Sequence, residues 1–122
     1  MTQMKVIVIG EDDSKTDYYM PIFSILNYDA SVCKNTNELF QLIDSLSPNL
    51  LFWSFTAAEI ENVDNFLLKF QQKYAEISRP KIILATASTD VGPRSSGIID
   101  WFLIEPILIS DFRELLKELL SQ

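Results

Sequence analysis

Five short apolar runs, separated by longer segments with helical apolar spacing, constrain the fold more than any other feature of this sequence. The runs, which we expect to be strands, are Lys5–Ile9, Ala30–Cys33, Leu50–Trp53, Ile82–Ala85 and Trp101–Ile104. Apolar runs without polar alternation are typical of strands covered on both faces, and helices between such strands favour parallel pairing. The sequence therefore predicts an α/β fold in which helices lie on both faces of a five-stranded parallel sheet.

The segments between the runs carry signals for helix starts and breaks. Asn35–Glu38 and Thr56–Glu59 each match a capping box ahead of a stripe of apolar residues, and Ser110 is expected to cap a last helix. Pro21 lies within the first helical segment, residues 15–26. We expect it to kink this helix or to mark a restart, because proline lacks an amide donor.

Residues 88–97 (STDVGPRSSG) are rich in turn-forming residues. Gly92, Pro93 and three serines disfavour a full helix there. Two interpretations stay open for this segment: a remodelled surface for a partner, or a solvated loop.

Composition excludes several classes of function. The chain contains no histidine, which excludes a Ser-His-Asp triad, a Cys-His pair, histidine metal ligands and a histidine phosphodonor. Its net charge of −7 argues against binding to nucleic acid or to an anionic membrane surface. The single cysteine, Cys33, has no partner for an internal disulfide and is expected to be a small buried residue.

Length and apolar content limit the organisation of the chain. Its 122 residues suit one domain, residues 1–122, without repeats or a linker. No segment reaches the roughly 18 uninterrupted apolar residues of a membrane span. Residues 1–10 lack the pattern of a secretory signal, so we expect a soluble, cytoplasmic protein.

Polar residues follow the predicted strands at the points where those strands end. They are Gly10–Asp13, Ser54–Ala57, Thr86–Ser88 and Glu105–Pro106. The carboxyl ends of parallel strands meet at one edge of a sheet, which is where ligand and catalytic sites of such folds lie. Any chemistry is therefore expected at this edge.

Four segments follow a known order and spacing. They are residues 27–39 (NYDASVCKNTNEL), Pro48–Ser54 (PNLLFWS), Ile82–Ala87 (IILATA) and Phe102–Pro106 (FLIEP). Together they resemble the receiver domain of two-component response regulators over essentially the whole chain. The resemblance implies a flavodoxin-like fold with strand order 2-1-3-4-5.

The same resemblance implies a phosphorylation site from which this chain departs. In the family, an acidic cluster holds Mg²⁺, an aspartate is phosphorylated, a hydroxyl senses the phosphoryl group and a lysine neutralises it. Here Ser54 stands at the phosphoacceptor position and Glu105 at the lysine position. Thr86 matches the switch hydroxyl, although counting from Pro80 without a gap would place Ala85 there. Because a serine hydroxyl is neutral at pH 7, the ordinary phosphorylation cycle is not expected.

Glu11, Asp12 and Asp13 follow the first strand, where the family has its acidic cluster. One interpretation is a weak Mg²⁺ site at Glu11 and Asp12, with carboxylate oxygens as ligands. The other is capping of the first helix, whose N-terminal end favours negative charge. With Ser54 in place of a further carboxylate, we favour capping and expect no bound metal or other cofactor.

Glu105 leaves three arrangements open. If its carboxylate enters the acidic pocket, like-charge repulsion should raise the pKa of at least one acid there. Alternatively it pairs with a nearby base such as Lys15, or it points outward. Without a matching lysine, we expect Glu105 and residues 11–13 to make this edge electronegative. The resemblance also implies a cis bond between Glu105 and Pro106.

We expect the chain to be a pseudo-receiver, a phosphorylation-independent protein-interaction module in signalling and not an enzyme. Its output surface is expected to extend from residue 88 to the last helix and to contact a signalling protein or, as a homodimer, a second copy. Tyr18, Tyr19 and Tyr28 are expected to be exposed aromatic residues that anchor such a partner.

Two alternatives remain at this level. One is a stand-alone response regulator that is phosphorylated at an acidic-cluster residue or at Ser54. The other is a small flavodoxin-like binding enzyme, which the three glycines of the chain do not support because they form no GxGxxG pattern.

Overall fold

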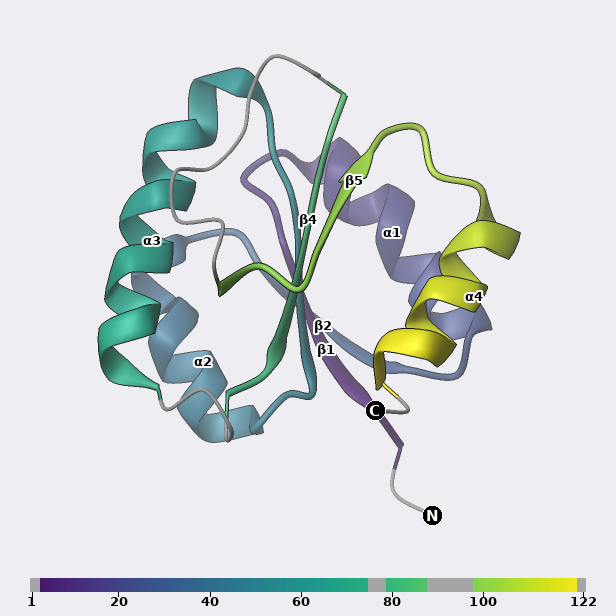
Figure 1. Ribbon diagram of the computed structural model, residues 1–122, viewed down its shortest axis with the longest axis horizontal. Coiled ribbons are helices and arrows are strands. Elements are labelled where there is room, and N and C mark those ends of the chain that lie inside the picture. The colour runs from purple at the N-terminus through teal and green to yellow at the C-terminus, as the bar shows by residue number, and fades with distance from the viewer. Residues whose placement is uncertain (1–2, 75–78, 88–97, 121–122) are drawn as a thin grey trace.

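The chain forms one five-stranded parallel sheet in a computed structural model that describes residues 3–74, 79–87 and 98–120 (Figure 1). The strands are β1 (Lys5–Ile9), β2 (Asp29–Cys33), β3 (Leu50–Ser54), β4 (Lys81–Thr86) and β5 (Trp101–Ile104). Their order is β2-β1-β3-β4-β5, and all neighbouring pairs are parallel. The predicted fold class and strand order are therefore confirmed.

Helices cover both faces of the sheet. They are α1 (Asp13–Ile25), the 3₁₀ turn η1 (Thr36–Glu38), α2 (Leu39–Leu46), the 3₁₀ turn η2 (Ala57–Glu59), α3 (Ile60–Lys73) and α4 (Ile109–Leu120). Figure 1 shows α2 and α3 on one face and α1 and α4 on the other. Within the described part of the chain, no helix combines the length and apolar content needed to cross a bilayer.

Alternate strand residues supply two apolar cores, one for each face of the sheet. Val6 and Val8 of β1 belong to the core that packs with α1 and α4, where the Phe52 ring contacts the rings of Phe23 and Phe112. The intervening residues Ile7 and Ile9 belong to the core under α2 and α3. Because both faces are covered, strand β3 is buried at every position.

The helix signals were partly correct. The Thr56–Glu59 capping box is present: Glu59 Oε1 accepts hydrogen bonds from the backbone N–H and the hydroxyl of Thr56, at 3.2 and 3.0 Å. The Asn35 side chain accepts a hydrogen bond from the backbone N–H of Asn37, but it caps η1, and α2 begins after that turn. The Ser110 cap was wrong, because α4 already begins at Ile109.

The predictions for α1 were partly wrong. The helix continues through Pro21, so the expected restart does not occur; Pro21 itself is exposed. Tyr19, expected to be exposed, is 1% exposed, because Tyr19, Ile22 and Phe23 form the buried stripe of the helix. Of the other two tyrosines, Tyr18 is exposed and Tyr28 is half-buried. The interpretations of residues 88–97 concern a segment outside the described residues.

Candidate functional site

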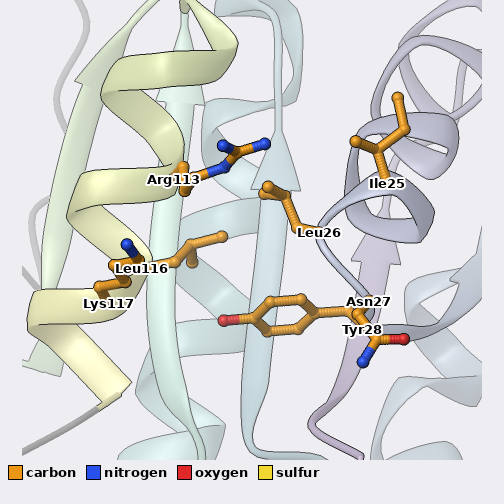
Figure 2. Close-up of a pocket in the computed structure, with 7 residues that line it drawn as sticks. All are labelled: Ile25, Leu26, Asn27, Tyr28, Arg113, Leu116 and Lys117. Atoms are coloured by element: carbon orange, nitrogen blue, oxygen red, sulfur yellow. The ribbon is translucent and has the colours of Figure 1, made fainter.

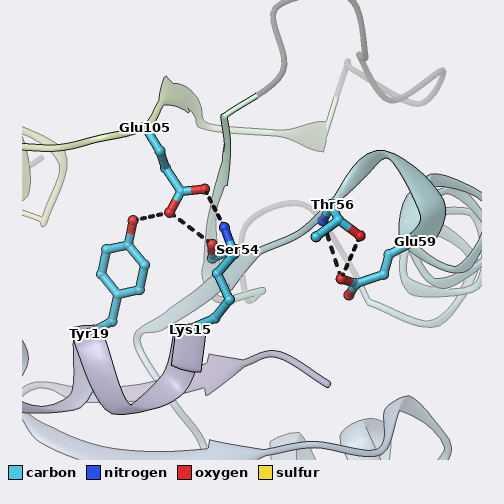
Figure 3. A network of polar contacts seen from close by, with 6 residues as sticks. All are labelled: Lys15, Tyr19, Ser54, Thr56, Glu59 and Glu105. Atoms are coloured by element: carbon cyan, nitrogen blue, oxygen red, sulfur yellow. Dashed lines mark hydrogen bonds and ion pairs between the residues drawn. The ribbon is translucent and has the colours of Figure 1, made fainter. Parts of the chain in front are cut away.

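Two polar residues, Ser54 and Glu105, lie at the carboxyl edge of the sheet, where β3 and β5 end. Ser54 is the last residue of β3 and pairs in register with Ala85 of β4; it is almost fully buried. Glu105 directly follows β5, and its backbone N–H donates a hydrogen bond to the Thr86 carbonyl at 2.9 Å. The peptide bond between Glu105 and Pro106 is cis. The Glu105 side chain points back over the end of β3 (Figure 3).

The carboxylate of Glu105 accepts three hydrogen bonds from three separate side chains (Figure 3). Its Oε1 lies 3.1 Å from the ammonium nitrogen Nζ of Lys15. Its Oε2 accepts from the Ser54 hydroxyl, at 3.0 Å, and from the hydroxyl of Tyr19. We call Lys15, Tyr19, Ser54 and Glu105 the Glu105 network.

Of the three arrangements open for Glu105, the structure shows pairing with Lys15. The two side chains are 24% and 11% exposed, so this ion pair is largely removed from water. The expectation of an electronegative edge without a lysine to offset it was wrong, because Lys15 reaches the carboxylate from α1. The sequence left this pairing open as one of three arrangements, because the position of α1 relative to the strand ends depends on how the helix packs on the sheet.

Tyr19 is the member of the network that sequence reasoning missed. Lys15 and Tyr19 are four residues apart on α1, a spacing that places two side chains on the same helix face. That spacing could have indicated that both reach Glu105. The Tyr19 ring also packs on Phe52, with ring centroids 4.5 Å apart, so the network rests directly on the core.

The three acids after β1 have separate partners. Asp12 is the N-cap of α1: its Oδ1 accepts a hydrogen bond from the Ser14 backbone N–H at 3.0 Å, which lowers the pKa of Asp12. Asp13 forms an ion pair with Lys34. The Glu11 carboxylate accepts a hydrogen bond of 3.4 Å from the Asn62 side-chain amide on α3.

This arrangement does not fit the Mg²⁺ ion that receiver domains bind. Glu11, Asp12 and Asp13 are all exposed, and each is engaged with a different group. Within the described ranges, no three acidic, cysteine or histidine residues are grouped closely enough to hold a metal ion. No chemical step through a metal is therefore derived for this site.

Two further residues singled out from the sequence also lie at the ends of strands. Thr86 is the last residue of β4 and is almost fully buried. Cys33 ends β2 and is also buried; its thiol donates a hydrogen bond to the Asn35 carbonyl, with 3.2 Å between sulfur and oxygen. Burial raises the pKa of the Cys33 thiol, which disfavours the reactive thiolate.

Tyr19 should make the protein sensitive to alkaline pH. Burial, reinforced by the hydrogen bond to Glu105, raises the pKa of the Tyr19 phenol above its ordinary value of 10.0. The Tyr19 phenol therefore ionises at a lower pH in the unfolded chain than in the folded protein. The contribution of Tyr19 to the free energy of unfolding is complete below pH 10 and is lost as the pH rises further. In urea unfolding, Tyr19→Phe should reduce the fall in stability above this pH by up to about 1.4 kcal/mol per pH unit. An unchanged pH slope in this variant would contradict the assignment.

Comparisons with known proteins identify structural relatives only. No protein-family model and no curated protein matches the sequence. A CheY-like receiver domain from Methanospirillum hungatei JF-1 is 18% identical, with a TM-score of 0.79, 98% of this chain and 95% of that chain being covered. The response regulator TrrA from Thermotoga maritima, solved with Mg²⁺ and BeF, is 17% identical, with a TM-score of 0.79 and coverage of 96% and 99%.

The solved structures also include a pseudo-receiver. The pseudo-receiver domain of the CikA protein is 12% identical, with a TM-score of 0.75, and 95% of this chain and 96% of that domain are covered. Identities this low establish the fold and nothing further. The structural neighbours of this chain are CheY-like response regulator receiver domains, as the sequence resemblance implied.

Proposed function

We propose that this chain, which has the receiver fold, works as a pseudo-receiver: a protein-interaction module in signalling that does not depend on phosphorylation. One observation carries the proposal. The carboxylate of Glu105 is hydrogen-bonded to Ser54, the residue at the phosphoacceptor position, and is held there by Lys15 and Tyr19. The chain thus supplies its own anion beside the position where a receiver would carry a phosphoryl group.

The Glu105 network opposes phosphoryl transfer in two ways. Phosphoryl donors are anionic, and catalysis of their reactions depends on cations that neutralise the transferring group. Here the one cation of the network, Lys15, is already paired with Glu105 at 3.1 Å. The Ser54 hydroxyl donates its proton towards a carboxylate that would repel the donor at close range.

The proposed partner surface lies at the outer edge of the sheet. Trp101 and Ile104 of β5 are 42% and 47% exposed; Leu108, just before α4, and Ile109, its first residue, are 66% and 41% exposed. Trp101 and Ile104 lie on opposite faces of β5, on either side of its exposed edge. We call them, together with Leu108 and Ile109, the β5 edge patch. In the described part of the chain, β5 pairs with β4 alone, so its outer backbone groups face away from the sheet. Large exposed apolar patches and edge strands are common docking features.

Charge narrows the kind of partner that suits this surface. A groove of about 320 Å³ beside the patch lies between β5 and α4, and its lining includes Trp101, Asp111 and Glu114. The chain as a whole has a net charge of −7. The negative charge of the chain would attract a partner segment that carries basic side chains. On contact, these basic side chains would suit Asp111 and Glu114, and the segment's apolar side chains would suit the β5 edge patch.

Addition of Mg²⁺ and beryllofluoride should leave the amide spectrum of this protein unchanged. The physical reason is that the acids after β1 do not converge and Glu105 occupies the surroundings of Ser54. The measurement is a two-dimensional ¹⁵N–¹H spectrum with and without the additives. The matched positive control is TrrA, which has been solved with Mg²⁺ and BeF.

The opposite outcome would identify the alternative function. Localised, saturable shifts at Glu11 and Ser54 would show that an aspartyl-phosphate analogue still binds. The chain would then act as a response regulator receiver with altered phosphorylation chemistry, and the proposal of phosphorylation independence would be wrong.

A further inference from the structure

A second groove, of about 350 Å³, lies between the C-terminal end of α1 and helix α4 (Figure 2). Tyr28, which lines it, directly precedes β2, so the groove lies at the amino-terminal edge of the sheet. Ser54 and Glu105 lie at the opposite edge. The groove is therefore separate from the Glu105 network, and nothing in the proposed function accounts for it. We call it the α1–α4 groove.

The wall of the α1–α4 groove is largely apolar. Ile25 and Leu26 contribute from the end of α1, and Leu116 from α4. Figure 2 shows the Tyr28 ring extending across the groove, with its hydroxyl directed towards α4. Ile25 is 64% exposed, so its apolar surface is open to a ligand in the groove. This wall can cover a short hydrocarbon chain or a ring.

Two cations line the same groove. Arg113 and Lys117 are four residues apart on α4, and Figure 2 shows the Arg113 guanidinium reaching from α4 towards Leu26. No acidic residue is among the lining residues. A positive charge pair therefore faces an apolar wall.

These cations differ from most others in the described part of the chain. Five basic residues there form ion pairs with acids: Lys15, Lys34, Lys73, Arg79 and Lys81. Arg113 and Lys117 form none with any described residue, although the chain has 17 acidic residues and only 10 basic ones. Like charges four residues apart on a helix destabilise it. Two cations on one side of the groove therefore favour a bound anion.

We propose that the α1–α4 groove binds a small amphiphilic carboxylate, a ligand with one carboxylate head and a short apolar tail. The guanidinium of Arg113 matches a carboxylate in shape and charge, and Lys117 adds a second cation. The apolar tail lies along Ile25, Leu26 and the Tyr28 ring. The volume of the groove falls at the lower end of the range found for small-ligand sites.

Octanoate is the probe that tests this site. In ¹⁵N–¹H spectra of the full chain, octanoate should cause saturable shifts at the amides of Asn27, Tyr28 and Leu116. Two comparison ligands separate the contributions: octanamide keeps the tail without the charge, and acetate keeps the charge without the tail. Both should bind at least about tenfold more weakly, since each loses one group of contacts.

Matched variants complete the test. Arg113→Gln should weaken octanoate binding about tenfold, and Lys117→Gln gives a second, independent variant if the first fails to fold. The control is Lys69→Gln, which removes a cation that forms no ion pair with a described residue and lies on α3. Equal binding of octanamide, equal weakening by Lys69→Gln, or shifts spread over the β5 edge patch would each overturn the proposal. None of these outcomes bears on the response to Mg²⁺ and beryllofluoride.

Discussion

Replacing Ser54 with aspartate, or Glu105 with lysine, should lower the free energy of unfolding by about 3 kcal/mol, whereas the double variant should stay within about 1 kcal/mol of the wild type. Ser54→Asp alone places a second carboxylate beside that of Glu105, because the Ser54 oxygen lies only 3.0 Å from Oε2. Glu105→Lys alone places a second ammonium beside Lys15 and leaves the Tyr19 hydroxyl without its acceptor. In the double variant, the new carboxylate lies between two lysines. The network then carries one more positive charge than in the wild type, but every charge has an opposite charge beside it.

Urea unfolding of the two single variants and the double variant measures this coupling directly. Glu114→Lys is the matched control for Glu105→Lys. It makes the same change of charge at an exposed residue of α4 and should change the free energy of unfolding by less than about 0.5 kcal/mol. Strict additivity of the two single effects would contradict the network, as would a single variant with wild-type stability. Confirmation would show that the two departures from the receiver pattern depend on each other.

Replacing Trp101 with serine should remove the main anchor of the β5 edge patch and weaken partner binding about 30-fold or more. Buried tryptophans at interfaces commonly contribute 2 kcal/mol or more, and about 1.4 kcal/mol corresponds to a factor of ten. Trp101 is 42% exposed and lies on the edge strand, so its loss should not disturb the core.

Affinity capture from the native cell, with tagged wild-type chain and variants, measures the effect. The control is Leu68→Ser on α3, which removes an apolar side chain that is 51% exposed but lies outside the β5 edge patch. Proteins that bind the wild type and the Leu68 variant but not the Trp101 variant would support the proposed surface. Binding that survives Trp101→Ser, or that is lost only in the Leu68 variant, would refute it. Size-exclusion chromatography over a dilution series determines whether the partner is a second copy.

The fold could be predicted because its signals are local. The run Leu50–Trp53 is apolar at each position since β3 is covered on both faces, and it could be recognised without knowing what covers it. The Thr56–Glu59 capping box spans four residues and depends on no other part of the chain. The exposure of Tyr19 was predicted incorrectly because Tyr18 and Tyr19 are adjacent residues of the same type. Tertiary contacts distinguish them: Tyr19 packs on Phe52 and Phe112 and donates a hydrogen bond to Glu105.

Most residues of the candidate site could be named from the sequence, but the contacts between their side chains could not be predicted. The sequence by itself determined that Ser54 and Glu105 stand at the ends of strands, and that no histidine or matching lysine accompanies them. Only the tertiary structure decided that Glu105 pairs with Lys15, 90 residues away, and with Tyr19, 86 residues away. Strand order brings those residues to one edge, but the reach of a side chain from α1 depends on how that helix packs on the sheet. Local sequence patterns do not encode that packing. The packing of α1 on the sheet is what brings Lys15 and Tyr19 within hydrogen-bonding distance of Glu105.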